Sequence, residues 1–158
     1  MSKVLLVNPP FYRLLGSHYN ANSLGIAYIA SVLNDHGHDA WLYNADFVSS
    51  TEYKNLSSLF EGFDDYKAYF KDDNNPLWIE IIKKIIDFQP DWVGYTSYTA
   101  NLSAINLISR LVKDALPDVK QIVGGVHATL DSDVLNKLLC VDYGVQREGE
   151  YATLKLVN

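Results

Sequence analysis

The chain has 158 residues, 48% of them hydrophobic and 20% charged, which is typical of one globular domain with a sizeable core. Its formal net charge of −6 and the absence of any basic cluster longer than Lys83-Lys84 argue against a nucleic-acid-binding surface. Every apolar run is far shorter than the roughly 20 residues that cross a bilayer, and no cleavage site follows the N-terminal run, so we expect no membrane span and a cytoplasmic location.

The first part of the chain predicts a strand, a helix and a second strand. Residues 3–8 form a short, continuous apolar run that ends at Pro9-Pro10, as expected for a buried parallel strand. Apolar side chains at helical spacing follow from Leu24 to Leu33, and Gly37 stands where the helix would end. Residues 38–45 then read as the second strand.

The second part of the chain continues the alternation of helices and strands. Helices are predicted from apolar positions within residues 79–86, 102–112 and 134–138. Strands are predicted at residues 91–97, 120–125 and 141–146. Five strands that alternate with helices indicate an α/β fold, a doubly wound parallel sheet with helices on both faces, within a single domain over residues 1–158.

Residues 47–77 interrupt this alternation. They hold six acidic residues and three lysines, and leucine and aromatic side chains recur in them at roughly helical spacing. We therefore predict an inserted helical segment. Its aromatic face either packs on its own domain or meets, in part, another domain or a large ligand. The apolar positions are Leu56, Leu59, Phe60, Phe63, Tyr66, Tyr69 and Phe70.

Ligands of open parallel sheets bind beyond the carboxyl ends of the strands, where the strand order reverses. The segments expected at this rim are residues 8–25, 96–101, 124–129 and 147–151. Within them, the pair Gly124-Gly125 would let a flat or bulky ligand approach the end of a strand closely. A tight turn into the next helix is the alternative explanation of the two glycines.

Several common nucleotide sites do not match these segments. The glycine patterns of a Walker loop and of a dinucleotide fold are absent from the sequence. Pro9 and Pro10 remove backbone N–H groups that the phosphate of a flavin would use. The third predicted strand ends in Thr96-Ser97 rather than in the aspartate of a phosphoryl receiver domain.

The histidines and paired carboxylates predict neither a metal site nor a catalytic residue. The stretch NDHGH at residues 34–38 is better explained as the end of a helix than as a metal cluster. His18 and His127 lie on the expected rim without partners at metal-ligand spacing, so each is interpreted as a polar contact. Glu148 and Glu150 would diverge in an extended segment, and we interpret them as binding or structural residues.

Five segments together resemble a known family. They are KVLLVNPP from residue 3, SLGIAYIASVLNDHGHDAWLYNAD from residue 23, PDWVGYTSYT from residue 90, IVGGVHAT from residue 122 and VDYGVQREGEYATLKLV from residue 141. The family is the N-terminal cobalamin-binding domain of cobalamin-dependent radical S-adenosylmethionine enzymes, which include the anaerobic magnesium-protoporphyrin IX monomethyl ester oxidative cyclase group and many methyltransferases. The resemblance implies a flavodoxin-like sheet that holds cobalamin over the carboxyl ends of its strands.

Carried over by position, the resemblance also implies which residues contact the cofactor. Thr96-Ser97-Tyr98 stands where relatives have Ser-x-Leu, and Arg147 stands where a glycine is more usual. The implied contacts are Asn8, Pro9, Pro10, Ser23, Leu24, Gly25, Thr96, Ser97, Tyr98, Thr99, Gly124, Gly125, His127, Ala128, Glu148, Gly149 and Glu150. Replacing Gly124 or Gly125 with valine is expected to block cofactor binding while the fold stays largely intact.

The chain departs from related proteins in two ways. Its first loop lacks the Asp-x-His-x-x-Gly motif of cobalamin-dependent mutases, so we expect no histidine ligand of that kind; Phe11, Tyr12 or Tyr19 would instead cover the lower face of the cofactor. With Cys140 as its one cysteine, the chain has no disulfide and no Cys-x-x-x-Cys-x-x-Cys motif. S-adenosylmethionine and the four-iron four-sulfur cluster would therefore belong to a C-terminal radical domain that is absent from this chain.

The resemblance thus implies a cobalamin-binding module of a longer enzyme, with the radical domain of the same protein as its partner. The chain by itself is not expected to be catalytic. The alternative is an interaction domain of the same fold that has lost cofactor binding and docks a partner through its aromatic insert.

Overall fold

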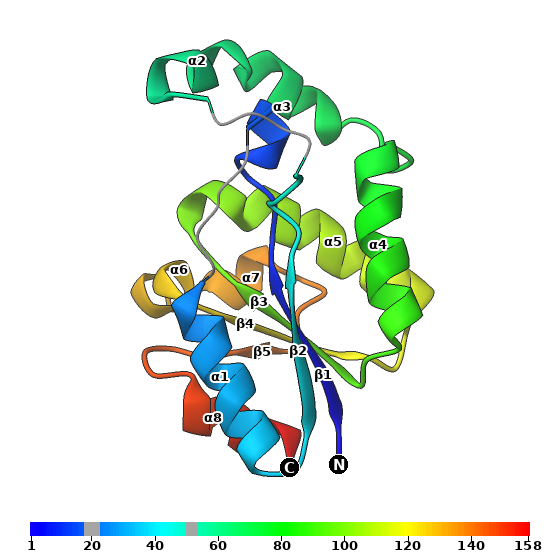
Figure 1. The fold of residues 1–158 in the computed structure, drawn as a ribbon, viewed down its shortest axis with the longest axis vertical. Helices are drawn as coiled ribbons and strands as arrows, with labels where there is room; N and C mark the ends of the chain where they lie inside the picture. Colours follow the sequence, from blue (N-terminus) through cyan, green and yellow to red (C-terminus); the bar gives the residue numbers. More distant parts are fainter. Residues whose placement is uncertain (18–22, 50–53) are drawn as a thin grey trace.

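Five parallel strands form one sheet in the computed structural model, which describes residues 1–17, 23–49 and 54–158 (Figure 1). The strands are β1 (Lys3–Asn8), β2 (Asp39–Asn44), β3 (Trp92–Thr96), β4 (Lys120–Gly124) and β5 (Tyr143–Gly144). Their order in the sheet is β2-β1-β3-β4-β5, so the order reverses between β1 and β3. This is the order of flavodoxin-like sheets, and the predicted fold class is confirmed.

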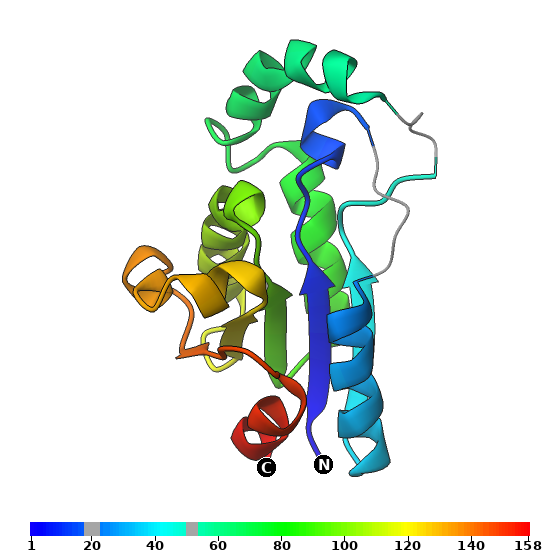
Figure 2. The same cartoon turned by 90° about the vertical axis from the view of Figure 1, so that its left-hand side faces the viewer.

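Helices cover both faces of this sheet (Figures 1 and 2). One face carries α1 (Leu24–Asp35) and α8 (Glu150–Val157), and the other carries α4 (Pro76–Phe88), α5 (Leu102–Ala115), α6 (Val126–Leu130) and α7 (Val134–Lys137). Successive side chains of a strand point to opposite faces. Val4 and Leu6 therefore pack in the core beneath α1 and α8, whereas Leu5 and Val7 pack in the core beneath α4 and α5.

Local sequence explains where two of these helices begin or end. The Asn75 side chain accepts a hydrogen bond from the backbone N–H of Leu77 at 3.0 Å, and Pro76 occupies the first position of α4. The helix α1 ends at Asp35, and Gly37 follows with a φ of 84°. The stretch at residues 34–38 therefore ends a helix, as the sequence predicted.

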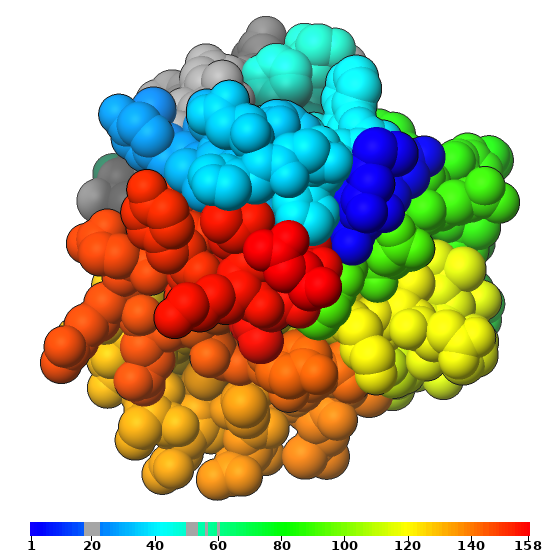
Figure 3. Space-filling model, turned by 90° about the horizontal axis from the view of Figure 1, so that it is seen from below, coloured from blue at the N-terminus to red at the C-terminus, as the bar shows by residue number. Residues whose placement is uncertain are grey.

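Both ends of the chain lie at the end of the sheet opposite the carboxyl ends of the strands. The hydroxyl of Ser2 donates to the backbone oxygen of Val157 at 3.2 Å. Figure 3 looks at this end of the molecule and shows α8 and α1 side by side next to the N-terminal residues. The edge formed by the carboxyl ends of the strands is therefore free of both termini.

The predicted insert contains two short helices, α2 (Leu56–Glu61) and α3 (Phe63–Tyr69), above the loop that follows β1 (Figure 1). The indole N–H of Trp78 donates to the backbone oxygen of Tyr69 at 2.7 Å, and the rings of Phe70 and Trp78 lie 5.5 Å apart. The aromatic face thus packs on its own domain, whereas Phe63 is 48% exposed. The insert ends slightly earlier than predicted, because Pro76 and Leu77 belong to α4.

Two helices were not anticipated from the sequence. The turn expected around His127 is the helix α6, and the closing segment that begins at Arg147 continues into α8, which buries Leu154 and Val157. In the described part of the chain, no helix combines the length and the apolar character needed to cross a membrane.

Candidate ligand-binding site

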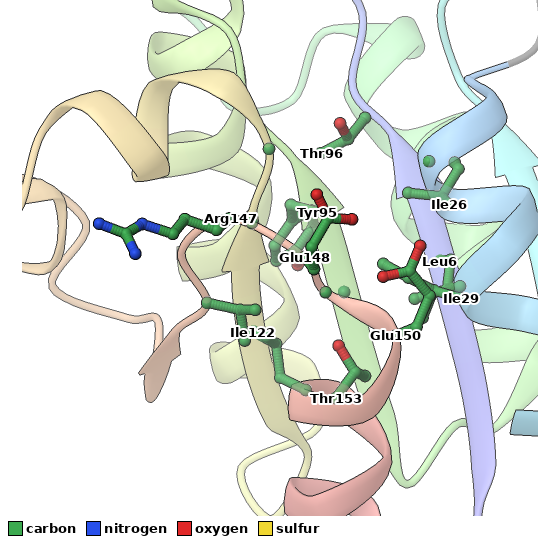
Figure 4. A pocket seen from close by; sticks show the side chains of 16 residues that line it. Leu6, Ile26, Ile29, Tyr95, Thr96, Ile122, Arg147, Glu148, Glu150 and Thr153 are labelled. Carbon is green, nitrogen blue, oxygen red and sulfur yellow. The ribbon is translucent and has the colours of Figure 1, made fainter. Parts of the chain in front are cut away.

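A cavity of about 160 Å³ lies between the sheet and the helices α1 and α8, beside the point where the strand order reverses (Figure 4). Its walls are mostly apolar, from Leu6, Ile26, Ile29, Ile122 and Val145. Gly94 contributes no side chain to the floor, and a Cβ atom added there would stand 2.7 Å from Leu6 Cδ2. Glycine in the middle of β3 therefore makes room for the Leu6 side chain, which lines the cavity. We call this space the deep cavity.

Two threonines place hydroxyl groups on the wall of the deep cavity. Thr96, at the carboxyl end of β3, is 7% exposed, and Thr153, in α8, is 3% exposed. Neither hydroxyl makes a hydrogen bond within the described part of the chain, and neither belongs to the fully buried polar atoms without a partner there, which are Tyr43 Oη and His127 Nε2. The hydroxyl of Tyr95, in contrast, donates to Gln121 Oε1 at 2.6 Å on the other face of the sheet. The deep cavity is thus apolar with two unpaired hydroxyls.

The loop between β5 and α8 forms the mouth of the deep cavity. Figure 4 shows the carboxylates of Glu148 and Glu150 on the cavity side of this loop, whereas the guanidinium of Arg147 points away. The backbone of Arg147 has a φ of 63°, a conformation that favours glycine, and its N–H donates to Thr129 Oγ1 at 2.9 Å. Glycine would adopt this conformation without strain.

A second, wider cavity of about 590 Å³, the outer cavity, adjoins the deep cavity at Gly25, which lines both. Its other lining residues are Asn8, Pro9, Phe11, Tyr12, Ser23, Leu24, Asp46, Tyr98, Ala100 and Asn101. The two spaces together follow the carboxyl edge of β1 and β3, where ligands of doubly wound sheets bind. Leu24 and Tyr98 are 70% and 45% exposed, so the outer cavity has an apolar rim open to a large ligand.

Asp46 holds the loop after β1 in place. Its Oδ1 atom accepts hydrogen bonds from the backbone N–H groups of Phe11 at 2.7 Å and Arg13 at 2.8 Å. Burial raises the pKa of the Asp46 carboxyl, and this effect outweighs the backbone hydrogen bonds, which favour the charged form. The carboxylate thereby fixes the position of Phe11 on the wall of the outer cavity.

Replacing Asp46 with alanine is expected to lower the free energy of unfolding by about 2–4 kcal/mol, because two backbone N–H groups lose a charged acceptor. Asparagine keeps an acceptor oxygen, so Asp46→Asn should cost less than about 1 kcal/mol. Urea unfolding of the three proteins at neutral pH measures both values. Equal stability of the alanine and asparagine variants would contradict this role of Asp46.

The same variants test how the stability depends on pH. Because the pKa of Asp46 is raised in the folded state, the folded protein holds this proton more tightly than the unfolded chain. The stability of the native protein relative to Asp46→Asn should therefore fall as the pH rises from about 4, the usual pKa of aspartate, through its raised folded value. Unfolding curves between pH 4 and pH 7 measure this difference.

Several of the residues that the sequence assigned to a ligand instead join the ends of β3 and β4. The hydroxyl of Ser97 donates to the backbone oxygen of Gly124 at 2.7 Å and accepts the backbone N–H of Ala128 at 3.2 Å. Thr99 Oγ1 lies 3.0 Å from His127 Nδ1. Five of the assigned residues line neither cavity: Pro10, Ser97, Thr99, His127 and Ala128. The side chains of Ser97 and Ala128 are fully buried.

Gly125 is required by the backbone. Its φ of 97° and ψ of −170° are practically restricted to glycine, and an added Cβ would stand 2.8 Å from the Ser97 nitrogen. The expectation that valine at Gly125 leaves the fold largely intact is therefore wrong. Gly124 is different, since its Cβ would meet its nearest atom, the Val145 oxygen, at 3.6 Å. A tight connection into α6 accounts for Gly125, and proximity to the cavity remains the explanation for Gly124.

The structure thus divides the predicted site residues into three groups. Gly25, Thr96, Gly124, Gly125, Glu148, Gly149 and Glu150 line the deep cavity. Asn8, Pro9, Ser23, Leu24, Gly25 and Tyr98 line the outer cavity. Pro10, Ser97, Thr99, His127 and Ala128 line neither. His18 and Tyr19 lie outside the described residues.

The sequence analysis missed the apolar walls of the deep cavity and Thr153. Among these residues, only Gly94, a glycine inside a strand pattern, was a local signal that another part of the chain approaches closely.

The sequence model of the family described as the B12 binding domain matches residues 15–157 of the chain. The chain belongs to the B12-binding domain family. An uncharacterized methyltransferase of Pyrococcus horikoshii is 28% identical over 161 residues, which cover 99% of this chain and 29% of that protein. The anaerobic magnesium-protoporphyrin IX monomethyl ester cyclase of Rubrivivax gelatinosus is 32% identical over 80 residues, or 50% of this chain and 14% of the cyclase. The corresponding cyclase of Synechocystis is 24% identical over 98% of this chain and 27% of the cyclase.

The names of these relatives, a methyltransferase and two cyclases, agree with the group that the sequence resembles. The chain spans less than a third of the length of each of them. Among solved structures, a CheY-like protein, TadZ of Pseudomonas aeruginosa, is similar with a TM-score of 0.54 over 98% of this chain and 91% of that chain. At 9% identity this similarity supports the doubly wound fold alone.

Proposed function

We propose that this B12-binding domain is the cobalamin-binding module of a larger radical S-adenosylmethionine enzyme of the methyltransferase or oxidative cyclase type. The base of the nucleotide tail would enter the deep cavity, and the flat corrin ring would lie over the outer cavity. One observation carries the proposal: an apolar cavity with unpaired hydroxyls opens beside a wide, partly aromatic cavity where the strand order reverses. The family membership supports it independently.

The residues present fit such a cofactor. An apolar cavity of roughly 150 Å³ in another protein accommodates benzene, so the deep cavity, at about 160 Å³, has room for an aromatic ring. A second fused ring would extend toward the mouth. Contact with Leu6, Ile29 and Ile122 would favour binding of the base in the deep cavity, because the apolar surface of the base and of these side chains is removed from solvent.

The described residues bind and orient in this proposal, and none of them reacts. When bound, cobalamin supplies the cobalt chemistry of methyl transfer or cyclisation, and the protein supplies position and exclusion of water. Glu148 and Glu150 would accept hydrogen bonds from amide or hydroxyl groups of the cofactor at the mouth. Phe11 and Tyr12 would cover the lower face of the corrin from the outer cavity.

The radical domain is the partner in this proposal. S-adenosylmethionine and the four-iron four-sulfur cluster would be bound there, since the chain has the single cysteine Cys140. The greater length of the relatives supports a multidomain parent protein. A cytoplasmic location is part of the proposal. The reaction on an organic substrate would then require both this domain and the radical domain.

The proposal predicts that the protein retains hydroxocobalamin. After mixing and gel filtration, the protein peak should be coloured, with close to one cofactor per chain measured from its visible absorbance. A colourless peak from protein that is folded by circular dichroism would contradict the proposal. It would favour the alternative of an interaction domain, for which the exposed Phe63 of the insert is the first residue to test.

A further inference from the structure

The strand β2 is the longer of the two edge strands of the sheet. It has six residues, whereas β5, at the other edge, has two. An exposed edge can pair with a strand of another molecule, and proteins often prevent this with a lysine, a proline or a bulge in the strand. The sequence DAWLYN of β2 contains neither residue, and its register with β1 is regular over all six pairs. Trp41 and Leu42 are 59% and 46% exposed, so the strand also presents apolar side chains at the surface.

Every second residue of β2 directs its backbone groups away from β1. The N–H of Asp39 donates to the Ser2 oxygen at 3.0 Å. The N–H of Ala45, just beyond the other end of the strand, donates to the Asn8 oxygen at 3.0 Å. Since the two directions alternate along a strand, the residues at even positions face outward, and these are Ala40, Leu42 and Asn44. In the part of the chain that the structure describes, the backbone groups of Leu42 have no hydrogen-bond partner.

The side chain of Asn34 occupies both outward groups of Ala40. Asn34 lies in the last turn of α1. Its Oδ1 atom accepts the backbone N–H of Ala40 at 2.8 Å, and its Nδ2 atom donates to the Ala40 oxygen at 3.0 Å. The amide thus forms the two bonds that a residue of a neighbouring antiparallel strand would form. A strand that approached this edge would find Ala40 already paired.

We propose that the outer edge of β2 is a pairing surface for β2 of a second copy of this chain, and that the Asn34 side chain keeps it closed. The edge fits a second copy because its outward residues are arranged symmetrically about Leu42. Antiparallel pairing around a two-fold axis at Leu42 would place Leu42 opposite its own copy and Ala40 opposite Asn44.

This pairing would give three residue pairs, each with two hydrogen bonds. When Asn34 holds Ala40 in both copies, the two outer pairs are lost and the pair at Leu42 remains. Two hydrogen bonds at the surface do not offset the loss of translational and rotational freedom on association. The native protein therefore does not pair through this edge.

The test compares the oligomeric state of the native protein, Asn34→Ala and the double variant Asn34→Ala/Leu42→Pro by sedimentation velocity at increasing concentration. Asn34→Ala should form a dimer at concentrations at which the native protein is monomeric, with a dissociation constant at least about tenfold lower. The N–H of Leu42 faces outward, so proline at this position removes a donor for the partner and leaves the bonds to β1 in place. The double variant should therefore be monomeric.

Hydrogen exchange distinguishes pairing at the edge from association of misfolded chains. In the native protein the amide of Ala40 should be protected and that of Leu42 should exchange rapidly. In the Asn34→Ala dimer the Leu42 amide should exchange at least about tenfold more slowly, because it donates to the second copy. A folded Asn34→Ala protein that stays monomeric would overturn the inference, as would a dimer that persists in the double variant.

Two further results would also overturn the inference. A native protein that already dimerises with a protected Leu42 amide would show that Asn34 does not close the edge. If Asn34→Ala does not fold by circular dichroism, Asn34→Ser takes its place, because its shorter hydroxyl cannot occupy both groups of Ala40. Failure of both variants to fold would show that Asn34 is needed for folding rather than for closing the edge.

Discussion

Replacing Gly125 with alanine is expected to lower the free energy of unfolding of the domain by about 3 kcal/mol or more. The residue has a backbone conformation that side chains rarely adopt, with a φ of 97°. The added Cβ would also stand 2.8 Å from the nitrogen and 2.9 Å from the oxygen of Ser97. Neither atom is free to move, because the Ser97 nitrogen donates to the Gly124 oxygen at 2.7 Å and its oxygen accepts the N–H of His127.

Gly124→Ala is the matched control for this prediction. Its Cβ would make ordinary contacts, the nearest at 3.6 Å from the Val145 oxygen, so its stability should stay within about 1 kcal/mol of the native protein. Urea denaturation followed by circular dichroism compares the two variants. Equal stability of Gly124→Ala and Gly125→Ala would show that the connection between β4 and α6 tolerates a side chain.

Periodicity predicted the elements better than it predicted their buried faces. The helix α4 was predicted from Ile79, Ile82, Ile85 and Ile86, which recur at helical spacing. In the structure Ile85 is fully buried, but Ile79 is 53% exposed and Ile86 is 37% exposed, and Trp78 is buried instead. Apolar residues occur on more than one side of this helix, so spacing alone does not determine which side faces the sheet.

Short elements were the ones that the sequence did not reveal. The helix α6 has five residues and α8 has eight, too few for a strong apolar period. Both follow glycine, Gly125 and Gly149, which indicated turns. Their positions depend on contacts with β3, β4 and α1 that are distant in sequence, such as those of Ser97 with Ala128.

The sequence predicted the residues at the rim of the candidate site but not those that form the walls of the deep cavity. Residues at the carboxyl ends of strands, such as Thr96 and Gly124, are brought together by the topology, which the alternation of elements predicts. The walls of the deep cavity come from the middle of β1 and β4, where Leu6 and Ile122 read as ordinary core residues. The cavity lies between the sheet and the helices α1 and α8, and a pattern in one segment carries no information about how these elements pack together.

Gly25 is the position at which a single added side chain is expected to have the largest effect on cofactor binding. It lines both cavities, and it lies one turn before Ile29 on the same face of α1. No atom lies within 4 Å of an added Cβ, and the backbone is helical without a positive φ. The Cβ atom of a leucine at Gly25 would therefore meet no protein atom, and its side chain would extend from the wall that the two cavities share.

Gly25→Leu is expected to weaken hydroxocobalamin binding at least about fiftyfold, because the tail and the ring of the cofactor would need the same passage. The melting temperature should stay equal or rise, since leucine favours a helix over glycine by up to about 1 kcal/mol. Ser31→Leu, on the exposed side of the same helix, adds a similar side chain away from both cavities and should bind like the native protein. If Gly25→Leu and Ser31→Leu retained hydroxocobalamin equally, the cofactor would not pass between the deep and outer cavities, and its tail would have to lie elsewhere on the rim.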